Sequence, residues 1–150
     1  GMSSHNVGLY SINTSTGAAS LIGTTAGITS FSNLGYNSDT DPMYATNSST
    51  DSFYTMNRAT GVMTLIGSLG GPTNPNGMAY NSDNGLLYMA DNSTDSLYTI
   101  NMATGGANLI GGMGTGNILG LVYVNPVPEP ATLAGLGIGA LALLRRRKKA

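Results

Sequence analysis

Carboxylates are the only abundant side chains in this sequence with the chemistry of acid–base catalysis or metal binding, and six of the seven are aspartates. There is no cysteine, which excludes thiolate nucleophiles, disulfides and cysteine-based metal sites. The single histidine, His5, stands near the N-terminus, and no Ser-His-Asp triad can be built around it. Paired carboxylates can serve as acid and base. Every aspartate, however, falls in a polar turn that recurs along the chain, so we expect ordinary solvated carboxylates and no catalytic residue.

Two of these turns have the composition of a calcium-binding loop. They run over residues 37–41 (NSDTD) and 81–85 (NSDNG). A loop of the EF-hand kind needs alternating oxygen ligands and a closing bidentate glutamate at its twelfth position. The twelfth positions here are Ser48 and Asn92. We therefore predict hairpin turns without a metal or cofactor, and keep calcium binding as an alternative.

Charge is sparse, at 9% of residues against about 25% in an average protein. Five of the six basic residues lie at positions 145–149, and Arg58 is the only other one. The part of the chain before residue 131 is therefore mildly acidic. Nucleic-acid binding needs a basic face that neutralises phosphates, so nucleic acid is excluded as a partner.

The elements that position these side chains repeat with a period of 44 residues. The segment Leu9–Gly17 returns as Phe53–Gly61 and again as Leu97–Gly105, and each copy then reaches a Leu-Ile-Gly sequence. All eight tyrosines fall on equivalent positions of the repeats, the last of them, Tyr123, offset by one residue. Repeated tyrosines indicate a structural role, because an active site needs different residues in different repeats.

Each repeat is predicted to form four short strands. In the best-defined copy we expect strands near residues 77–80, 86–90, 96–101 and 107–110, joined by turns rich in Asn, Asp and Gly. Because side chains alternate along a strand, Tyr98 and Ile100 should share one face, with Leu97 and Thr99 on the other. Helical periodicity is missing before Ala131, which predicts an all-β body.

Four strands in a unit of this length are typical of a β-propeller blade. The motif Leu-Tyr-(Ser/Thr)-Ile-Asn-x-x-Thr-Gly-x-x-x-Leu-Ile-Gly resembles propeller-like repeats of secreted bacterial proteins, over residues 8–124. The chain holds the last two strands of one blade, two whole blades, and one first strand near residues 119–124. Closed propellers have about 4–8 blades. We therefore expect an incomplete or open array whose free strand edges promote self-association.

The C-terminal residues form three consecutive elements. Val127, Pro128, Glu129 and Pro130 precede an apolar run over residues 131–144, and a basic cluster ends the sequence. The prolines keep their segment extended, as a processing enzyme requires. The basic residues are expected to stay on the cytoplasmic side of a membrane. These are Arg145, Arg146, Arg147, Lys148 and Lys149.

This tail resembles the PEP-CTERM sorting signal of bacterial exported proteins. The resemblance implies that an exosortase, a membrane protease-transpeptidase, recognises residues 127–130 and releases the membrane segment. The apolar run is 14 residues long, and a spanning helix needs about 17–25. Flanking residues and snorkelling by Arg145 are expected to make up the difference. An ordinary single-pass anchor and a C-terminal core helix are the alternatives.

The sequence thus predicts three regions: a flexible N-terminus with a cloning remnant (1–7), a propeller-like repeat domain (8–124) and a sorting tail (125–150). No signal peptide is visible, and we expect one upstream. We predict an exported, non-enzymatic structural or adhesive protein, held transiently in the inner membrane before it reaches the cell envelope or extracellular matrix. The alternatives are a module that binds calcium or a glycan such as extracellular polysaccharide, a fragment of a propeller enzyme, and a degenerate gene fragment.

Overall fold

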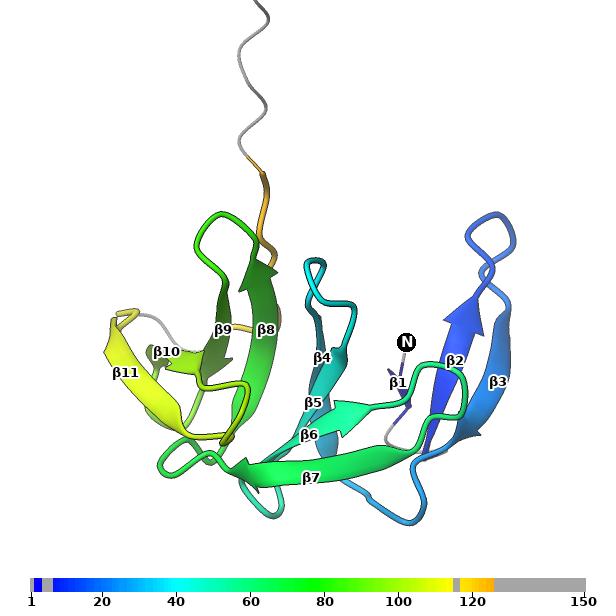
Figure 1. Ribbon diagram of the computed structural model, residues 1–150, viewed down its shortest axis with the longest axis horizontal. Coiled ribbons are helices and arrows are strands. Elements are labelled where there is room, and N and C mark those ends of the chain that lie inside the picture. Colours follow the sequence, from blue (N-terminus) through cyan, green and yellow to red (C-terminus); the bar gives the residue numbers. More distant parts are fainter. Residues whose placement is uncertain (1, 4–6, 115–116, 126–150) are drawn as a thin grey trace, which may run out of the picture.

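The computed structural model describes residues 2–3, 7–114 and 117–125. Within them the chain forms only β-strands, turns and extended segments, which confirms the all-β prediction. The strands make three antiparallel sheets that lie side by side along an arc (Figure 1). None of the described residues forms a helix with the length and hydropathy that a membrane crossing requires. The predicted membrane segment, residues 131–144, lies outside the described part of the chain.

The first sheet contains three strands, in the order β1-β2-β3. Strands β2 (Gly8–Ile12) and β3 (Ala19–Thr24) are the predicted last two strands of a blade. Strand β1 (Met2–Ser3) was not predicted, and it pairs with β2 through Met2 opposite Leu9. The same pairing joins Thr46 to Phe53 one period later, so β1 stands for part of the second strand of a repeat.

The other two sheets are complete four-stranded meanders, in the orders β4-β5-β6-β7 and β8-β9-β10-β11. The first contains β4 (Phe31–Tyr36), β5 (Met43–Asn47), β6 (Ser52–Met56) and β7 (Met63–Ser68). The second contains β8 (Pro75–Asn81), β9 (Leu86–Asp91), β10 (Ser96–Ile100) and β11 (Ala107–Gly112). These bounds agree with the strands expected from the sequence to within about two residues, the usual uncertainty of strand ends.

The turn between the third and fourth strands of each repeat needs a residue in the left-handed region. Gly17, Gly61 and Gly105 occupy it with φ of 73°, 73° and 84°. A side chain there would meet the following carbonyl, so glycine is the residue that suits this position. The recurrence of the Thr-Gly pair therefore marks the position of this hairpin turn.

Two hydrophobic clusters hold neighbouring sheets together. One lies between the sheet of β1–β3 and that of β4–β7, and it includes Leu9, Tyr54 and Met56. The other lies between the sheet of β4–β7 and that of β8–β11, and it includes Phe53, Tyr98 and Ile100. Tyr98 and Ile100 thus share a buried face, as predicted. Tyr44 stacks on Phe53 in this second cluster, with ring centroids 5.0 Å apart.

Residues 117–125 run beside β8 without joining a sheet. A Cβ placed on Gly77 of β8 would come within 2.8 Å of the backbone of Gly120 and Leu121. The predicted first strand near residues 119–124 is therefore present as an extended segment next to β8. Among the described residues it has no second strand to pair with.

Candidate functional site

The polar turns are organised by asparagine side chains that bind the backbone of their own turn. The Oδ1 atom of Asn57 accepts hydrogen bonds from the backbone N–H groups of Ala59 and Thr60, at 2.9 and 3.1 Å. Asn13 and Asn101 make the same pair of contacts in the other two repeats. Such Asx turns replace water as the partner of the backbone, so these polar residues serve the hairpins.

Asp91 departs from the sequence prediction that every aspartate is solvated. It ends β9 and is completely buried. Its Oδ1 accepts the N–H of Asn74 at 2.7 Å, and its Oδ2 accepts hydrogen bonds from the backbone and hydroxyl groups of Ser93 and Thr94. Burial raises the pKa of Asp91, but hydrogen bonds from Ser93, Asn74 and Thr94 outweigh it, and the net pKa is lowered. Asp91 therefore anchors a loop as a carboxylate.

A second set of carboxylates connects neighbouring sheets. The hydroxyl of Tyr80, at the end of β8, donates to Oδ2 of Asp39 in the turn after β4, at 2.7 Å. This hydrogen bond raises the pKa of Tyr80. One repeat later Tyr123 lies beside Asp83, and that carboxylate raises the pKa of Tyr123 to about 12. The Tyr123 hydroxyl is buried, and no atom of the described residues, Asp83 included, meets the distance and angle limits of a hydrogen bond with it. The repeat thus recreates a tyrosine–aspartate contact between successive units.

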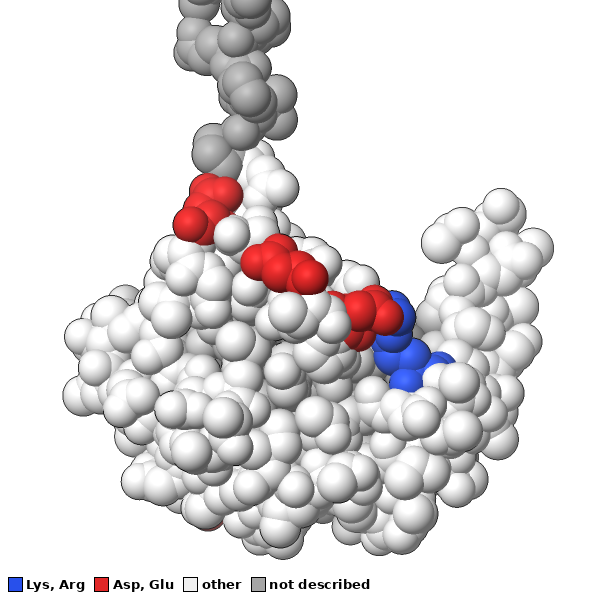
Figure 2. Space-filling view, viewed as in Figure 1, with Lys and Arg blue, Asp and Glu red and all other residues white. Residues whose placement is uncertain are grey.

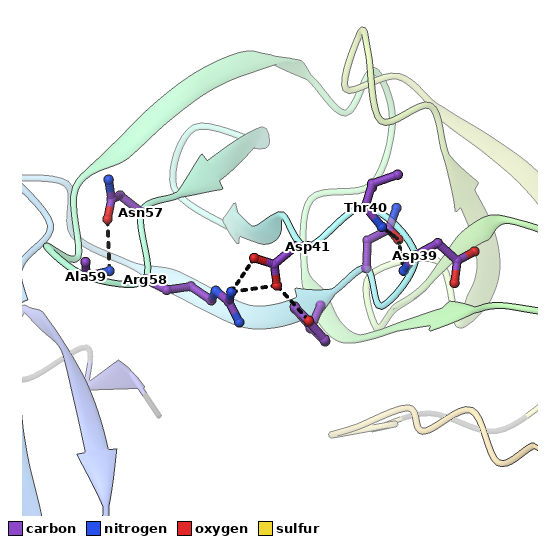
Figure 3. A network of polar contacts seen from close by, with 8 residues as sticks. Asp39, Thr40, Asp41, Asn57, Arg58 and Ala59 are labelled. Atoms are coloured by element: carbon purple, nitrogen blue, oxygen red, sulfur yellow. Dashed lines mark hydrogen bonds and ion pairs between the residues drawn. The ribbon is translucent and has the colours of Figure 1, made fainter.

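Asp41 is the centre of an exposed polar cluster (Figure 3). Its carboxylate accepts hydrogen bonds from the Arg58 guanidinium and from the Tyr36 hydroxyl, the latter at 2.8 Å. The guanidinium also lies 5.1 Å from the centre of the Tyr36 ring. The hydrogen bond to Asp41 is the main reason why the pKa of Tyr36 is raised. Because Arg58 and Asp41 are 46% and 66% exposed, water screens their attraction, and such pairs contribute about 0–1 kcal/mol.

On the face seen in Figure 2, acidic side chains form a row along one rim of the molecule. Arg58 is the one basic residue in the described part of the chain, and it lies at the end of this row. The described residues include no group of three or more His, Cys, Asp or Glu side chains arranged to hold a metal ion. His5 and the sorting residues 127–130 and 145–149 lie outside the described residues. Carboxylates on this rim accept hydrogen bonds from side chains of neighbouring turns and sheets.

The last sheet carries an apolar pocket on the face that points away from its neighbours. The pocket has a volume of about 240 Å³. Its lining comes from β8, β9 and β10 on one side and from the segment 117–125 on the other: Ala79, Asn81, Tyr88, Leu97, Leu121, Val122 and Tyr123. No residue in this lining is a nucleophile paired with a base. The lining is mainly apolar, and Asn81, Tyr88 and Tyr123 are its polar residues.

The comparison with known protein families decides the identity of the repeat body. Residues 1–111 match the family described as a repeat of unknown function (DUF6923). The chain belongs to this family. Residues 126–148 of this DUF6923 protein match the PEP-CTERM protein-sorting motif, which confirms the resemblance inferred from the tail. No curated protein matches the chain.

Sequence reasoning did not identify the buried loop anchor Asp91, nor the contact of Tyr80 with Asp39 between two repeats. The alignment of repeats held one signal for Asp91: the preceding copy has an asparagine, Asn47, at the equivalent position. Tyr80 and Asp39 were each recognised as repeated, but their contact joins two different repeats, which a period alone does not reveal.

Proposed function

We propose that this DUF6923 protein is an exosortase substrate whose repeat body has a non-enzymatic, structural or adhesive role in the cell envelope or extracellular matrix. The PEP-CTERM match over residues 126–148 carries the proposal. That motif implies an exported protein which is anchored transiently in the membrane and then processed. Residues 127–130 would be the recognition segment, and residues 131–144 and 145–149 the membrane helix and its cytoplasmic stop.

The hydrogen bonds of the aspartates in the repeat body support a structural role. Asp91, Asp39 and Asp41 are engaged by neighbouring backbone, tyrosine and arginine groups. A catalytic carboxylate would instead need to face a substrate with its pKa tuned toward neutrality. The order β4-β5-β6-β7, repeated by β8–β11, supports the further proposal that each four-stranded sheet is a propeller blade.

The test of sorting is the intact mass of the protein recovered from its own cells, with and without the exosortase. Cleavage near Val127–Pro130 only in cells that contain the enzyme would support the proposal. A protein ending at Ala150 in both strains would refute it and indicate an ordinary membrane anchor. A variant with Glu129→Ala in the recognition segment, compared with Glu129→Gln, would then show whether the charge or the size of that side chain is read.

A further inference from the structure

Neighbouring sheets pack through one contact that occurs twice within the chain. Leu9 in β2 and Phe53 in β6 occupy the third strand of their repeats. They point toward the next sheet and are 3% and 0% exposed. The equivalent residue of the last sheet is Leu97, which lines the open pocket instead. The last sheet therefore presents one half of a packing contact whose other half is empty in the described structure.

The first sheet presents the complementary half. Met56 and Ile100 face the preceding sheet and are each 4% exposed. The equivalent residue of the first sheet, Ile12, is 50% exposed. At the two ends of the arc, then, stand the two faces that pack against each other inside it (Figure 1).

Glycines show that the two faces match in shape as well as polarity. A Cβ on Gly23 would overlap the backbone of Thr60, and a Cβ on Gly67 would overlap that of Thr104. Each glycine of a Leu-Ile-Gly sequence therefore admits the Thr-Gly turn of the next sheet. The unmatched copies are Gly111 on the last sheet and Gly17 on the first, and neither has an atom within 4 Å of its Cβ position.

The strand inventory of the two ends is complementary too. The first sheet has three described strands and no innermost strand, whereas residues 117–125 lie beside β8 without a sheet to join. Val122 and Val124 in this segment are 81% and 71% exposed. The residues that follow this segment, 126–148, match the sorting motif.

We propose that these two faces bind each other in a dimer of this chain. The first sheet of one copy packs on the last sheet of the other, and residues 117–125 complete that first sheet as its innermost strand. Gly111 then receives the Thr16-Gly17 turn of the second copy. Three sheets from each copy give a ring of six, within the range of about 4–8 in which propellers close. A head-to-tail contact of this kind forms a ring when its rotation closes.

The test is the mass of the full 150-residue chain, purified in mild detergent and measured by light scattering during gel filtration. We expect a dimer. Gly111→Val should leave the fold of a single copy intact, with an unchanged circular dichroism spectrum, because within one copy its Cβ meets open space. Its melting temperature should fall only by what association contributed. Each ring contains this contact twice, so the substitution should raise the dissociation constant of the dimer by about 100-fold. Gly112→Val is the matched control and should stay dimeric, because the equivalent residues Thr24 and Ser68 remain exposed beside their neighbouring sheets.

The opposite face provides an independent check. Ile12→Asp should also give a monomer, because it places a charge in the apolar contact. A mixture of the two variants should regain association. The Gly111→Val protein keeps its first sheet intact and the Ile12→Asp protein keeps its last sheet intact, so these two faces can still pack together. A monomeric parent chain would overturn the proposal. It would indicate that further repeats, and not a second copy, cover the two end faces. Equal association of the Gly111→Val and Gly112→Val proteins would overturn it as well, and would place the contact elsewhere, such as in the tail.

Discussion

Exchanging Asp91 for asparagine tests how the loop after β9 is held. The equivalent residue of the preceding repeat is already an asparagine, Asn47, so the backbone accepts either side chain. Their partners differ, however. Asn47 donates from Nδ2 to the carbonyl oxygen of Thr29 at 2.7 Å, whereas Asp91 accepts from the N–H of Asn74 at 2.7 Å. In Asp91→Asn the amide nitrogen would oppose the Asn74 N–H, donor against donor.

The expected cost follows from that mismatch. A hydrogen bond to a charged group contributes about 1.5–3 kcal/mol, and leaving a buried donor without a partner costs about 1–3 kcal/mol. We expect Asp91→Asn to lower the free energy of unfolding by about 2–3 kcal/mol at pH 7. The melting temperature should fall by about 4 °C per kcal/mol, or about 8–12 °C. Circular dichroism of the full chain during thermal and denaturant unfolding measures both quantities.

The pH dependence separates the charge of Asp91 from its shape. The pKa of Asp91 is lowered in the folded protein from its ordinary value of 3.8. Its stabilisation is therefore fully present above pH 3.8 and is lost as the pH falls through the folded value. The difference between the parent and Asp91→Asn should shrink below that pH. Asp95→Asn, at an exposed position of the same loop, is the control and should change nothing. An Asp91→Asn protein as stable as its parent at pH 7 would refute the reasoning.

Three further predictions concern contacts between successive repeats. Gly67→Ala should destabilise the protein by about 1–3 kcal/mol in thermal unfolding, because its Cβ overlaps Thr104, and Gly112→Ala, whose Cβ meets open space, should not; equal melting temperatures would contradict the packing described. Tyr80→Phe should lower the melting temperature by removing the hydrogen bond to Asp39, and an unchanged value would mean that water replaces it. Asp83 raises the pKa of Tyr123 to about 12, so their contact stabilises the fold below pH 10 and is lost as the pH approaches 12. Absorbance titration follows this step, which should vanish in Tyr123→Phe and move to lower pH in Asp83→Asn.

The sequence by itself determined the units of this protein. The period of 44 residues located β6 and β10, because a hairpin depends on local chemistry: an Asx turn, a left-handed glycine and alternating apolar residues. The same holds for the sorting tail, whose three elements follow one another directly in the chain and match the PEP-CTERM motif.

Only the tertiary structure decided how the units meet. The hydrogen bond of Tyr80 to Asp39 and the contact of Gly67 with Thr104 each join two different repeats. Equivalent residues of successive repeats also differ in their exposure to solvent. Ile12, Met56 and Ile100 hold equivalent positions, yet the first is half exposed and the others are buried. A periodic pattern specifies each sheet, but exposure is set by the sheet that packs against it, which lies far away along the chain.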